Sequence, residues 1–323
     1  MKSKSLQYLL GLVWVVTVVV TLAMFVRIWP FELLVSFTPQ IFIALGLVGL
    51  LSTAGIFWSN RAEFYWPQII MPILVLVTLC LSLGYASMLQ PVAQPAVLPG
   101  NTMVRFITFN KLYTNTKIDE MAAYFKTERP DVIALQEIAP NEVRRLASAM
   151  GYRHSYVSDY QNTVRGTSAA LISRHPIVEQ RTIPLSQNSS LVRIVTEVPG
   201  KGRIAFYAVH LVGPFSEDMY RERNEAARQM AFLLEADKLP LVIGGDFNTT
   251  VFSPILQDFN TVTTDSLYSV TAKQWPPCSW YGYGAPLCLR IDHVYHSQSL
   301  SLAGVRIAPN LGSDHRAVIT DLQ

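Results

Sequence analysis

Long apolar runs fill the N-terminal part of the chain, whereas the remaining residues alternate between short apolar runs and polar, amphipathic stretches. Three long runs cover residues 6–26, 37–58 and 67–89. Each contains the ~20 mainly apolar residues that a helix needs to cross ~30 Å of hydrocarbon. The pattern therefore predicts that residues 1–89 form a membrane anchor of three transmembrane helices.

The few positive charges in this part of the chain predict how the anchor is oriented. Lys2 and Lys4 precede the first run and Arg61 follows the second, whereas Arg27 alone lies between these two runs. Basic residues concentrate in cytoplasmic loops, so the N-terminus is expected inside the cell. Three crossings then place the C-terminal part in the periplasm or the extracellular space. We therefore expect a multi-pass protein of the plasma or inner membrane.

A proline-rich segment, residues 90–102, separates the anchor from the rest of the chain. Pro91, Pro95 and Pro99 occur there with small residues between them. Such a composition favours a semi-extended conformation. The segment is therefore expected to be a tether that lets the following domain, residues 103–323, stand off the bilayer.

Beyond the tether, short apolar runs have the length and composition of β-strands, and the stretches between several of them have helical spacing. Predicted strands cover residues 103–108, 132–135, 169–173, 191–198, 203–210, 291–295 and 317–320, and one further strand is predicted to begin at Leu241. Residues 199–202 are expected to join two of these strands as a hairpin. Predicted helices cover residues 118–128, 139–150 and 218–234, the last with Arg and Glu on its solvent-facing side. The segment that follows the Leu241 strand, up to Leu289, is expected to be irregular. Mixed β-sheets covered by helices fit this pattern.

Charge and cysteine content narrow the picture further. Residues 103–323 carry nearly equal numbers of basic and acidic side chains. No strong polyanion-binding field follows from this balance, although local basic patches are compatible with it. Cys278 and Cys288 flank a turn-rich stretch, and a disulfide that closes it would fit an oxidising compartment. Two independent buried thiols are the alternative.

Polar side chains occur repeatedly where the predicted strands end. Glu137 follows the strand of residues 132–135, and a carboxylate at the edge of the core is the hard oxygen ligand that Mg²⁺ prefers. A solvated loop glutamate is the alternative. His210 ends another strand, and Asp314–His315 precede the last one. Asp292 is positioned in the sequence to orient one of the histidines and raise its basicity, as a carboxylate does in hydrolytic triads.

Asp246 and Asn248 follow the Leu241 strand and alternate around Phe247. An extended backbone points both polar side chains to one side and the ring into the core. An aspartate can polarise a water molecule, and an asparagine amide can donate to a phosphoryl oxygen. A simple Asx turn is the alternative. Gly244 and Gly245 favour a site, because they let the backbone approach a neighbour or ligand closely.

Several other hydrolytic motifs are absent from the sequence. It contains no Gly-x-Ser-x-Gly nucleophile turn, no His-Glu-x-x-His metalloprotease motif and no Gly-x-x-x-x-Gly-Lys phosphate loop. No Cys–His cluster suits structural zinc. Serine hydrolases, zinc proteases and nucleoside triphosphatases of these kinds are therefore excluded.

The polar residues resemble, in their order, the endonuclease/exonuclease/phosphatase superfamily, which includes DNase I-like nucleases, neutral sphingomyelinases and inositol-polyphosphate 5-phosphatases. The resemblance covers residues 103–323, including residues 166–176, which are similar to the central strand of that family. It implies a four-layer α/β sandwich of two mixed β-sheets flanked by helices. The motifs occur in the order Asn110, Glu137, His210, Asp246-x-Asn248, Asp292 and Ser313-Asp314-His315.

The resemblance also implies roles for individual residues. Metal-binding roles for a Mg²⁺ cofactor, with Mn²⁺ as an alternative, are implied for Asn110, Glu137 and Asp314. Catalytic roles are implied for His210, Asp246, Asn248, Asp292 and His315. Within this set Asp246 orients or deprotonates the attacking water, and His315 is a general acid or base paired with Asp292. These two roles are exchangeable, because family members differ in the residue that activates water.

Together these features predict a membrane-anchored, Mg²⁺-dependent phosphoesterase that hydrolyses phosphodiester or phosphomonoester bonds. The expected partners are the lipid bilayer, through three helices, and a phosphate-ester substrate. Nucleic acid, nucleotide, phospholipid and inositol phosphate are all compatible with the motifs. The alternative is a catalytically silent, membrane-tethered binding or signalling module of the same fold.

Overall fold

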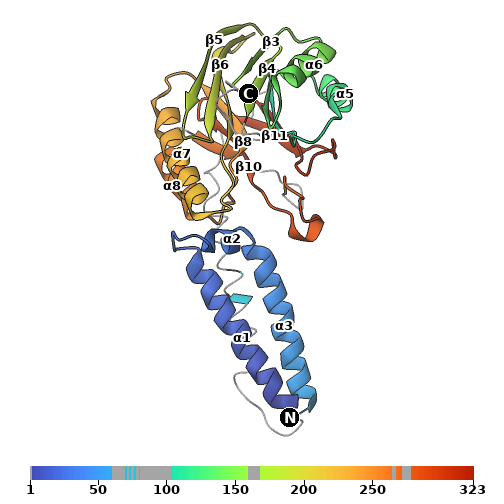
Figure 1. The fold of residues 1–323 in the computed structure, drawn as a ribbon, viewed down its shortest axis with the longest axis vertical. Coiled ribbons are helices and arrows are strands. Elements are labelled where there is room, and N and C mark those ends of the chain that lie inside the picture. The colour runs from blue at the N-terminus through green and yellow to red at the C-terminus, as the bar shows by residue number, and fades with distance from the viewer. Residues whose placement is uncertain are drawn as a thin grey trace. The chain divides into compact units, whose positions relative to one another are not determined.

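The computed structural model describes residues 2–59, 103–158, 168–263, 267–270 and 278–323, together with Ile70, Ile73, Leu76, Val77 and Cys80. The chain divides into two compact units (Figure 1). The first comprises residues 1–89 with residues 251–257, and the second comprises residues 90–250 and 258–323.

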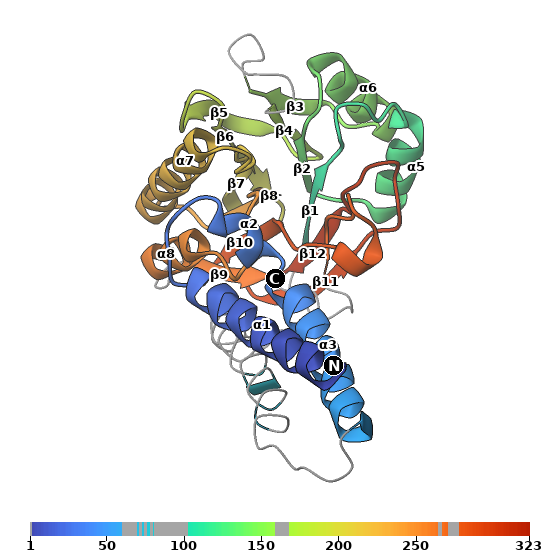
Figure 2. The same ribbon diagram turned by 60° about the horizontal axis from the view of Figure 1, so that its bottom comes forward.

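The N-terminal unit contains the helices α1 (Lys2–Ala23), α2 (Phe31–Ser36) and α3 (Thr38–Ser59). α1 and α3 contact each other along the unit and run side by side (Figures 1 and 2). Among the residues that the structure describes, no helix combines the length and the apolar character needed to cross a membrane. The three predicted transmembrane helices, and the bilayer as their partner, therefore find no support in these residues. Most of the third predicted span, residues 67–89, and the predicted tether, residues 90–102, lie outside the described residues.

Two six-stranded sheets form the second unit. The first has the strand order β11 (Leu302–Ile307), β12 (Val318–Leu322), β1 (Val104–Asn110), β2 (Val132–Gln136), β4 (Ala169–Ser173) and β3 (His154–Val157). The second has the order β5 (Ile177–Pro184), β6 (Ser190–Val198), β7 (Gly202–His210), β8 (Leu241–Asp246), β10 (Asp292–Ser297) and β9 (Leu267–Val270). β1 pairs with β2 and β7 pairs with β8 in parallel, whereas the other neighbours are antiparallel. Both sheets are therefore mixed, as predicted.

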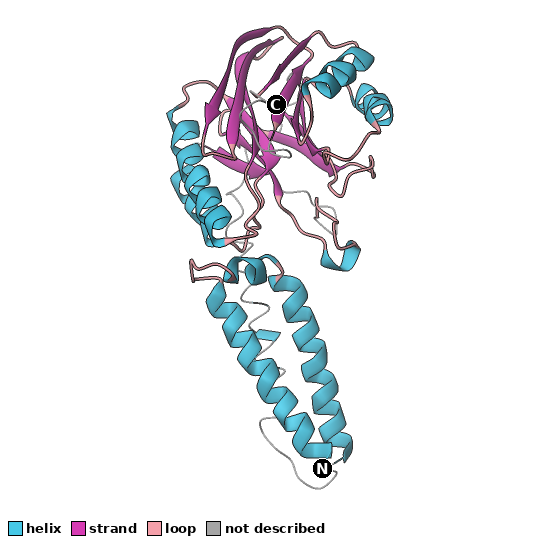
Figure 3. Cartoon of the chain, in the orientation of Figure 1, coloured by secondary structure: helices cyan, strands magenta, loops and turns pink. Residues whose placement is uncertain are grey.

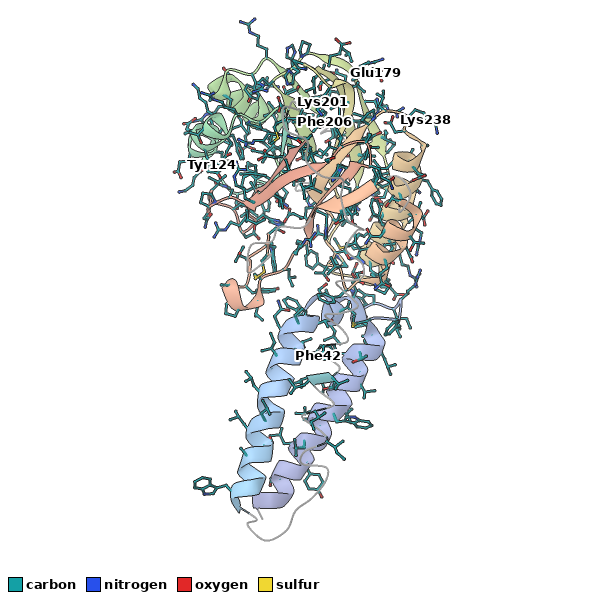
Figure 4. The ribbon with its side chains drawn as sticks, turned by 180° about the vertical axis from the view of Figure 1, so that it is seen from behind. Phe42, Tyr124, Glu179, Lys201, Phe206 and Lys238 are labelled. Atoms are coloured by element: carbon teal, nitrogen blue, oxygen red, sulfur yellow. A yellow bond between two sulfur atoms is a disulfide. The ribbon has the colours of Figure 1, made fainter. Side chains whose placement is uncertain are left out.

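The two sheets pack face to face, and helices cover their outer faces (Figure 3). The rings of Phe106 of β1 and Phe206 of β7 stack in the layer between the sheets, with 5.9 Å between their centroids (Figure 4 labels Phe206). α5 (Ile118–Glu128) and α6 (Pro140–Met150) cover the first sheet through an apolar cluster that includes Phe125 and Leu146. α7 (Glu217–Ala236) lies on the side of the second sheet (Figure 2). The predicted four-layer sandwich of this unit is confirmed.

The predicted strands and helices of the core are present, and β6 and β7 form the predicted hairpin in continuous register. Three further strands, β3, β5 and β11, were not predicted. None of their side chains is fully buried and they lack a clear apolar alternation, because each lies at a sheet edge. The prediction of an irregular segment before Leu289 was wrong in part, since this segment contains α8 (Pro254–Thr263) and β9.

Candidate active site

Three neighbouring strands of the second sheet bring predicted site residues to one edge. In the parallel pair β7–β8 His210 is in register with Asp246, and in the antiparallel pair β8–β10 Asp246 is in register with Asp292. The last residues of β7 and β8 therefore meet the first residue of β10. All three side chains are at least nine-tenths buried.

The first sheet contributes Asn110 and Glu137. Asn110 ends β1 in register with Gln136 of β2, and Glu137 follows directly with a left-handed φ of +55°. The Asn110 Nδ2 group donates to Glu137 Oε1 at 2.9 Å and to Asp246 Oδ2 at 3.1 Å. One carboxamide thus joins a carboxylate of each sheet. The backbone N–H of Tyr113 donates to Glu137 Oε2 at 3.0 Å, which fixes this carboxylate from the other side.

Gly244 and Gly245 allow β8 to reach this position between its neighbours. A Cβ atom on Gly245 would lie 1.9 Å from the Val209 carbonyl oxygen, and one on Gly244 would lie 2.5 Å from the Phe106 ring. Side chains at these positions would push β8 away from β7 and from the facing sheet. The close approach predicted from the Gly–Gly pair is thus to neighbouring protein atoms.

The chain leaves the strand at Asn248, whose φ is +48°. Asp246 Oδ1 accepts from the backbone N–H of Asn248 at 2.8 Å, so the Asx turn considered from the sequence exists within the site. The backbone at Asn248 is left-handed and not extended as predicted, but Asp246 Oδ2 still lies 3.6 Å from His210 Nε2, so both polar side chains reach the same histidine. The Asn248 Nδ2 group donates to the Leu211 carbonyl at 2.7 Å and lies 3.4 Å from His210 Nε2.

Two buried nitrogen groups that the sequence did not single out hold this turn. Arg223 of α7 is fully buried and donates from Nη1 to the Asn248 carbonyl at 2.9 Å. His293 Nε2 lies 2.8 Å from the Thr249 carbonyl. Burial lowers the pKa of His293 to about 3, so its ring is neutral at physiological pH. The prediction that the Arg residues of the 218–234 helix face solvent was wrong for Arg223, because its partner lies after β8.

His315 completes the buried part of the site. Its Nδ1 lies 2.8 Å from Asp292 Oδ2, and its Nε2 lies 3.7 Å from Asp246 Oδ2. Burial alone lowers the pKa of His315, but Asp292 and Asp246 raise it overall above its usual range. Burial raises the pKa of the Asp246 carboxyl, a shift that His315 opposes. The predicted pairing of His315 with Asp292 is present in the structure.

Asp314 occupies a different environment from the other acidic residues. Trp280 Nε1 donates to Asp314 Oδ2 at 2.9 Å, and the backbone N–H of Tyr281 donates to the Asp314 carbonyl at 2.7 Å. Ser313 Oγ donates to the Asn110 carbonyl at 2.8 Å and so ties this segment to the end of β1. Trp280 is a further site-contacting residue, and its distance from Asp314 in the sequence gave no local signal of the contact.

The residues brought together suit a divalent cation. Ligand atoms of Asp246, Asp292 and His315 lie within 4.8 Å of one another, and Asp292 Oδ1 is buried without a hydrogen-bond partner among the described residues. A cation would favour the ionised form of Asp246, which burial disfavours. Glu137 and Asn248 are only partly buried and lie at the same edge of the sheets. Carboxylate and carboxamide oxygens are the ligands that Mg²⁺ takes in proteins.

The chain is similar to known proteins over this unit. A profile of the Endonuclease/Exonuclease/phosphatase family matches residues 104–315. The crystal structure of an endonuclease/exonuclease/phosphatase from Beutenbergia cavernae DSM 12333 is 23% identical, with a TM-score of 0.57, and 68% of this chain covers 71% of that one. Among curated proteins none matches the sequence significantly.

Two further solved structures share the fold at lower identity. D. rerio TDP2 complexed with single-strand DNA product is 13% identical, with a TM-score of 0.56, and 69% of this chain covers 100% of that one. The human Nocturnin catalytic domain with bound sulfate anion is 17% identical, with a TM-score of 0.54, and 68% of this chain covers 93% of that one. At these identities the likeness shows the fold.

Proposed function

The chain belongs to the endonuclease/exonuclease/phosphatase family, and on this premise we propose that it is a metal-dependent phosphodiesterase. The proposal is carried by one observation, the meeting of Asn110, Glu137, Asp246 and His315 at the facing edges of two sheets. A packing role does not explain why two carboxylates, an imidazole and a carboxamide converge there, since buried polar groups are costly to desolvate.

Glu137 is the proposed holder of Mg²⁺, with Mn²⁺ as an alternative, and Asp246 and Asp292 would supply further oxygen atoms. Asn110 is kept from the resemblance as a metal-binding residue, although its Nδ2 group donates to Glu137 and its Oδ1 accepts from the backbone N–H of Leu112. The family resemblance implies a metal-binding role for Asp314, and we retain this role in the proposal, although Asp314 Oδ2 accepts from the Trp280 indole. A bound divalent cation stabilises negative charge that develops on phosphoryl oxygens during ester cleavage.

The other site residues are proposed to act on the attacking water and on the phosphate group of the substrate. Asp246 is buried, and its carboxylate is oriented by Asn110, so it can hold and polarise an attacking water. Asp292 and Asp246 raise the pKa of His315 and so favour its protonated form, which can donate a proton or stabilise phosphate charge. Asn248 and His210 lie next to each other and are proposed to contact the non-bridging phosphate oxygens.

The substrate class is proposed at the level of a phosphodiester. The D. rerio TDP2 structure holds a single-strand DNA product, and the human Nocturnin domain holds a sulfate anion, a phosphate-like group. Both ligands are compatible with a site for phosphate groups on this fold. Nucleic acid, nucleotide, phospholipid headgroup and inositol phosphate share this chemistry.

We propose separately that the N-terminal unit associates with lipid and that the second unit acts outside the cytoplasm. Leu22, Leu47 and Leu51 are among the large apolar side chains that α1 and α3 leave exposed. A disulfide joins Cys278 and Cys288, and disulfides persist mainly in oxidising compartments. Carbonate extraction of cell membranes and a reporter fused at Gln323 test the two statements. Release of the protein by carbonate, or a reporter active only in the cytoplasm, would contradict them.

The test of activity is hydrolysis of bis(4-nitrophenyl) phosphate by the purified full-length protein. Turnover that depends on Mg²⁺ or Mn²⁺ and stops with a chelator is expected. A well-folded protein that binds phosphodiesters without hydrolysing them would instead favour the silent binding module.

A further inference from the structure

Lys111, which follows Asn110 at the end of β1, has a fully buried side chain. Its backbone N–H donates to the carbonyl of Gln136 at 3.0 Å, so it lies beside the residue that precedes Glu137. Lysine is seldom buried completely, because its ammonium group loses hydration that only charged or hydrogen-bonding partners offset. An ammonium group is thus held inside the protein next to two proposed metal-binding residues.

The Lys111 ammonium group joins two segments of the chain. Its Nζ donates to the Asn115 carbonyl and to Glu142 Oε1, both at 2.9 Å. Asn115 belongs to the loop between β1 and α5, whereas Glu142 lies in the first turn of α6. The other oxygen of this carboxylate, Oε2, accepts from the backbone N–H of Ala139 at 2.9 Å. Lys111 therefore ties the β1–α5 loop to the segment that leads from Glu137 into α6.

The β1–α5 loop also holds the Glu137 carboxylate directly. Tyr113, midway between Lys111 and Asn115, donates its backbone N–H to Glu137 Oε2 at 3.0 Å. The far end of this part of the loop is fixed as well, because Asn115 Nδ2 donates to the Leu311 carbonyl at 3.0 Å. The two segments that Lys111 joins are therefore the ones that set the position of this carboxylate.

The energetics of the Lys111–Glu142 ion pair favour a role in geometry. The Lys111 side chain is fully buried, and the Glu142 side chain is 23% exposed. Removing such charges from water costs about as much as their attraction returns, so apolar side chains of similar size are often equally stable in their place. The hydrogen bonds of the pair, however, require their partners at fixed positions. The ion pair is therefore better suited to fixing its two segments relative to each other than to stabilising the fold.

We propose that Lys111 is a positioning residue, which holds Glu137 in the geometry for Mg²⁺ by joining the β1–α5 loop to the start of α6. The proposal rests on the proposed function, in which Glu137 holds the metal. Lys111 acts through Glu137 and not on the cation, since an ammonium group has no lone pair to offer. A carboxylate that is already in place binds a cation more tightly, because less order is lost on binding.

The test separates geometry from charge with the double variant Lys111→Met/Glu142→Gln. The two substitutions leave the net charge unchanged, and a glutamine oxygen still accepts from the Ala139 N–H. Calorimetry gives the dissociation constant for Mg²⁺ of the full-length protein, and circular dichroism verifies its fold. The double variant is expected to raise this constant about tenfold, the lower end of the usual effect of groups that orient metal ligands. A merely structural role would lower the free energy of unfolding in urea and leave the dissociation constant of the folded protein unchanged.

Two further variants complete the test. Lys117→Met/Glu120→Gln removes an exposed ion pair by the same substitutions and is expected to bind Mg²⁺ like the wild type. Glu142→Asp keeps the charge at a partly exposed position but shortens the side chain, and it is also expected to raise the dissociation constant. This variant decides the test where the double variant does not fold.

Three results would overturn the proposal. They are an unchanged dissociation constant in the folded double variant, an unchanged constant in Glu142→Asp, and an equal rise in the variant of the exposed pair. Failure of the proposed function is separate, since it shows as Mg²⁺ binding that depends on Lys111 without hydrolysis of bis(4-nitrophenyl) phosphate. A wild-type protein that binds no Mg²⁺ would overturn both.

Discussion

His315 is oriented by Asp292, with 2.8 Å between the imidazole Nδ1 and the carboxylate Oδ2, so that its Nε2 faces Asp246. The two residues come from different segments, the end of the chain and the start of β10. Their contact keeps one ring nitrogen occupied and leaves the other directed at the proposed reacting atoms. This geometry is what general acid–base catalysis requires of a histidine.

Replacing Asp292 by asparagine therefore has a specific expected effect. A neutral carboxamide at this position would no longer hold the ring by charge, and kcat should fall by about 10²–10⁴, the usual contribution of a positioned acid or base. Because Asp292 raises the pKa of His315, its loss should also move the alkaline limb of the kcat profile to lower pH. Steady-state kinetics across pH checks both. Asp119→Asn, at an exposed ion pair, is the control, and equal rates in the two variants would contradict the assignment.

The metal-holding role of Glu137 predicts an effect on binding that does not require turnover. Glu137→Gln removes one negative charge and should raise the dissociation constant for Mg²⁺ at least about tenfold, since Mg²⁺ is held by few carboxylates. Calorimetric titration of Mg²⁺ into the purified variant gives the dissociation constant, and circular dichroism verifies its fold. Glu120→Gln, on the exposed side of α5, should bind Mg²⁺ like the wild type. An unchanged dissociation constant in Glu137→Gln would place the metal elsewhere.

The contact between Arg223 and the Asn248 carbonyl predicts that α7 supports the site from behind. Arg223→Gln should lower the free energy of unfolding by about 1–3 kcal/mol, because a buried carbonyl loses its donor. It should also lower kcat about tenfold through the misplaced Asn248 side chain, as expected when a group is positioned less well. Arg221→Gln, an exposed change on the same helix, is the matched control for urea unfolding and kinetics. Wild-type kcat with reduced stability would limit Arg223 to a structural role.

Asp237 predicts a pH dependence of stability away from the site. Burial raises the pKa of its carboxyl, but hydrogen bonds from Arg193 and Tyr207 lower it overall. A lowered pKa in the folded state means stability that is present above the unfolded value of about 4 and is lost as the pH falls below it. Urea unfolding should give Asp237→Asn a lower free energy of unfolding than the wild type at neutral pH. The difference between the two proteins should be smaller at about pH 3, below the unfolded pKa. A constant difference would contradict this linkage.

Part of the site was predictable because its signals are local. At His210 and Asp246 a polar residue ends an apolar strand, and Glu137 comes directly after one. Parallel pairing then brings such ends to one edge of a sheet, so the sequence pattern translates directly into proximity. The pairing of Asp292 with His315 was implied by family resemblance and is present in the structure.

Other features were not predictable because their partners are distant in the sequence. In the sequence Arg223 does not differ from other arginines of an amphipathic helix, and only the fold shows that it donates to the turn after β8. The Trp280–Asp314 contact depends on the fold of the loop that the Cys278–Cys288 disulfide closes. The strands β5 and β11 lie at sheet edges, where one side chain face is not required to be apolar, and they therefore lack the pattern that identified central strands.

Metal-dependent phosphodiester hydrolysis at this site is tested most directly by the rate of bis(4-nitrophenyl) phosphate hydrolysis. The rate is measured for the wild-type, Asp246→Ala and His315→Ala proteins, with Mg²⁺ and with a chelator. We expect metal-dependent turnover by the wild type and a loss of about 10²-fold or more in each variant, with both variants folded. Turnover that is the same with and without metal, or that is unchanged in either variant, would contradict it.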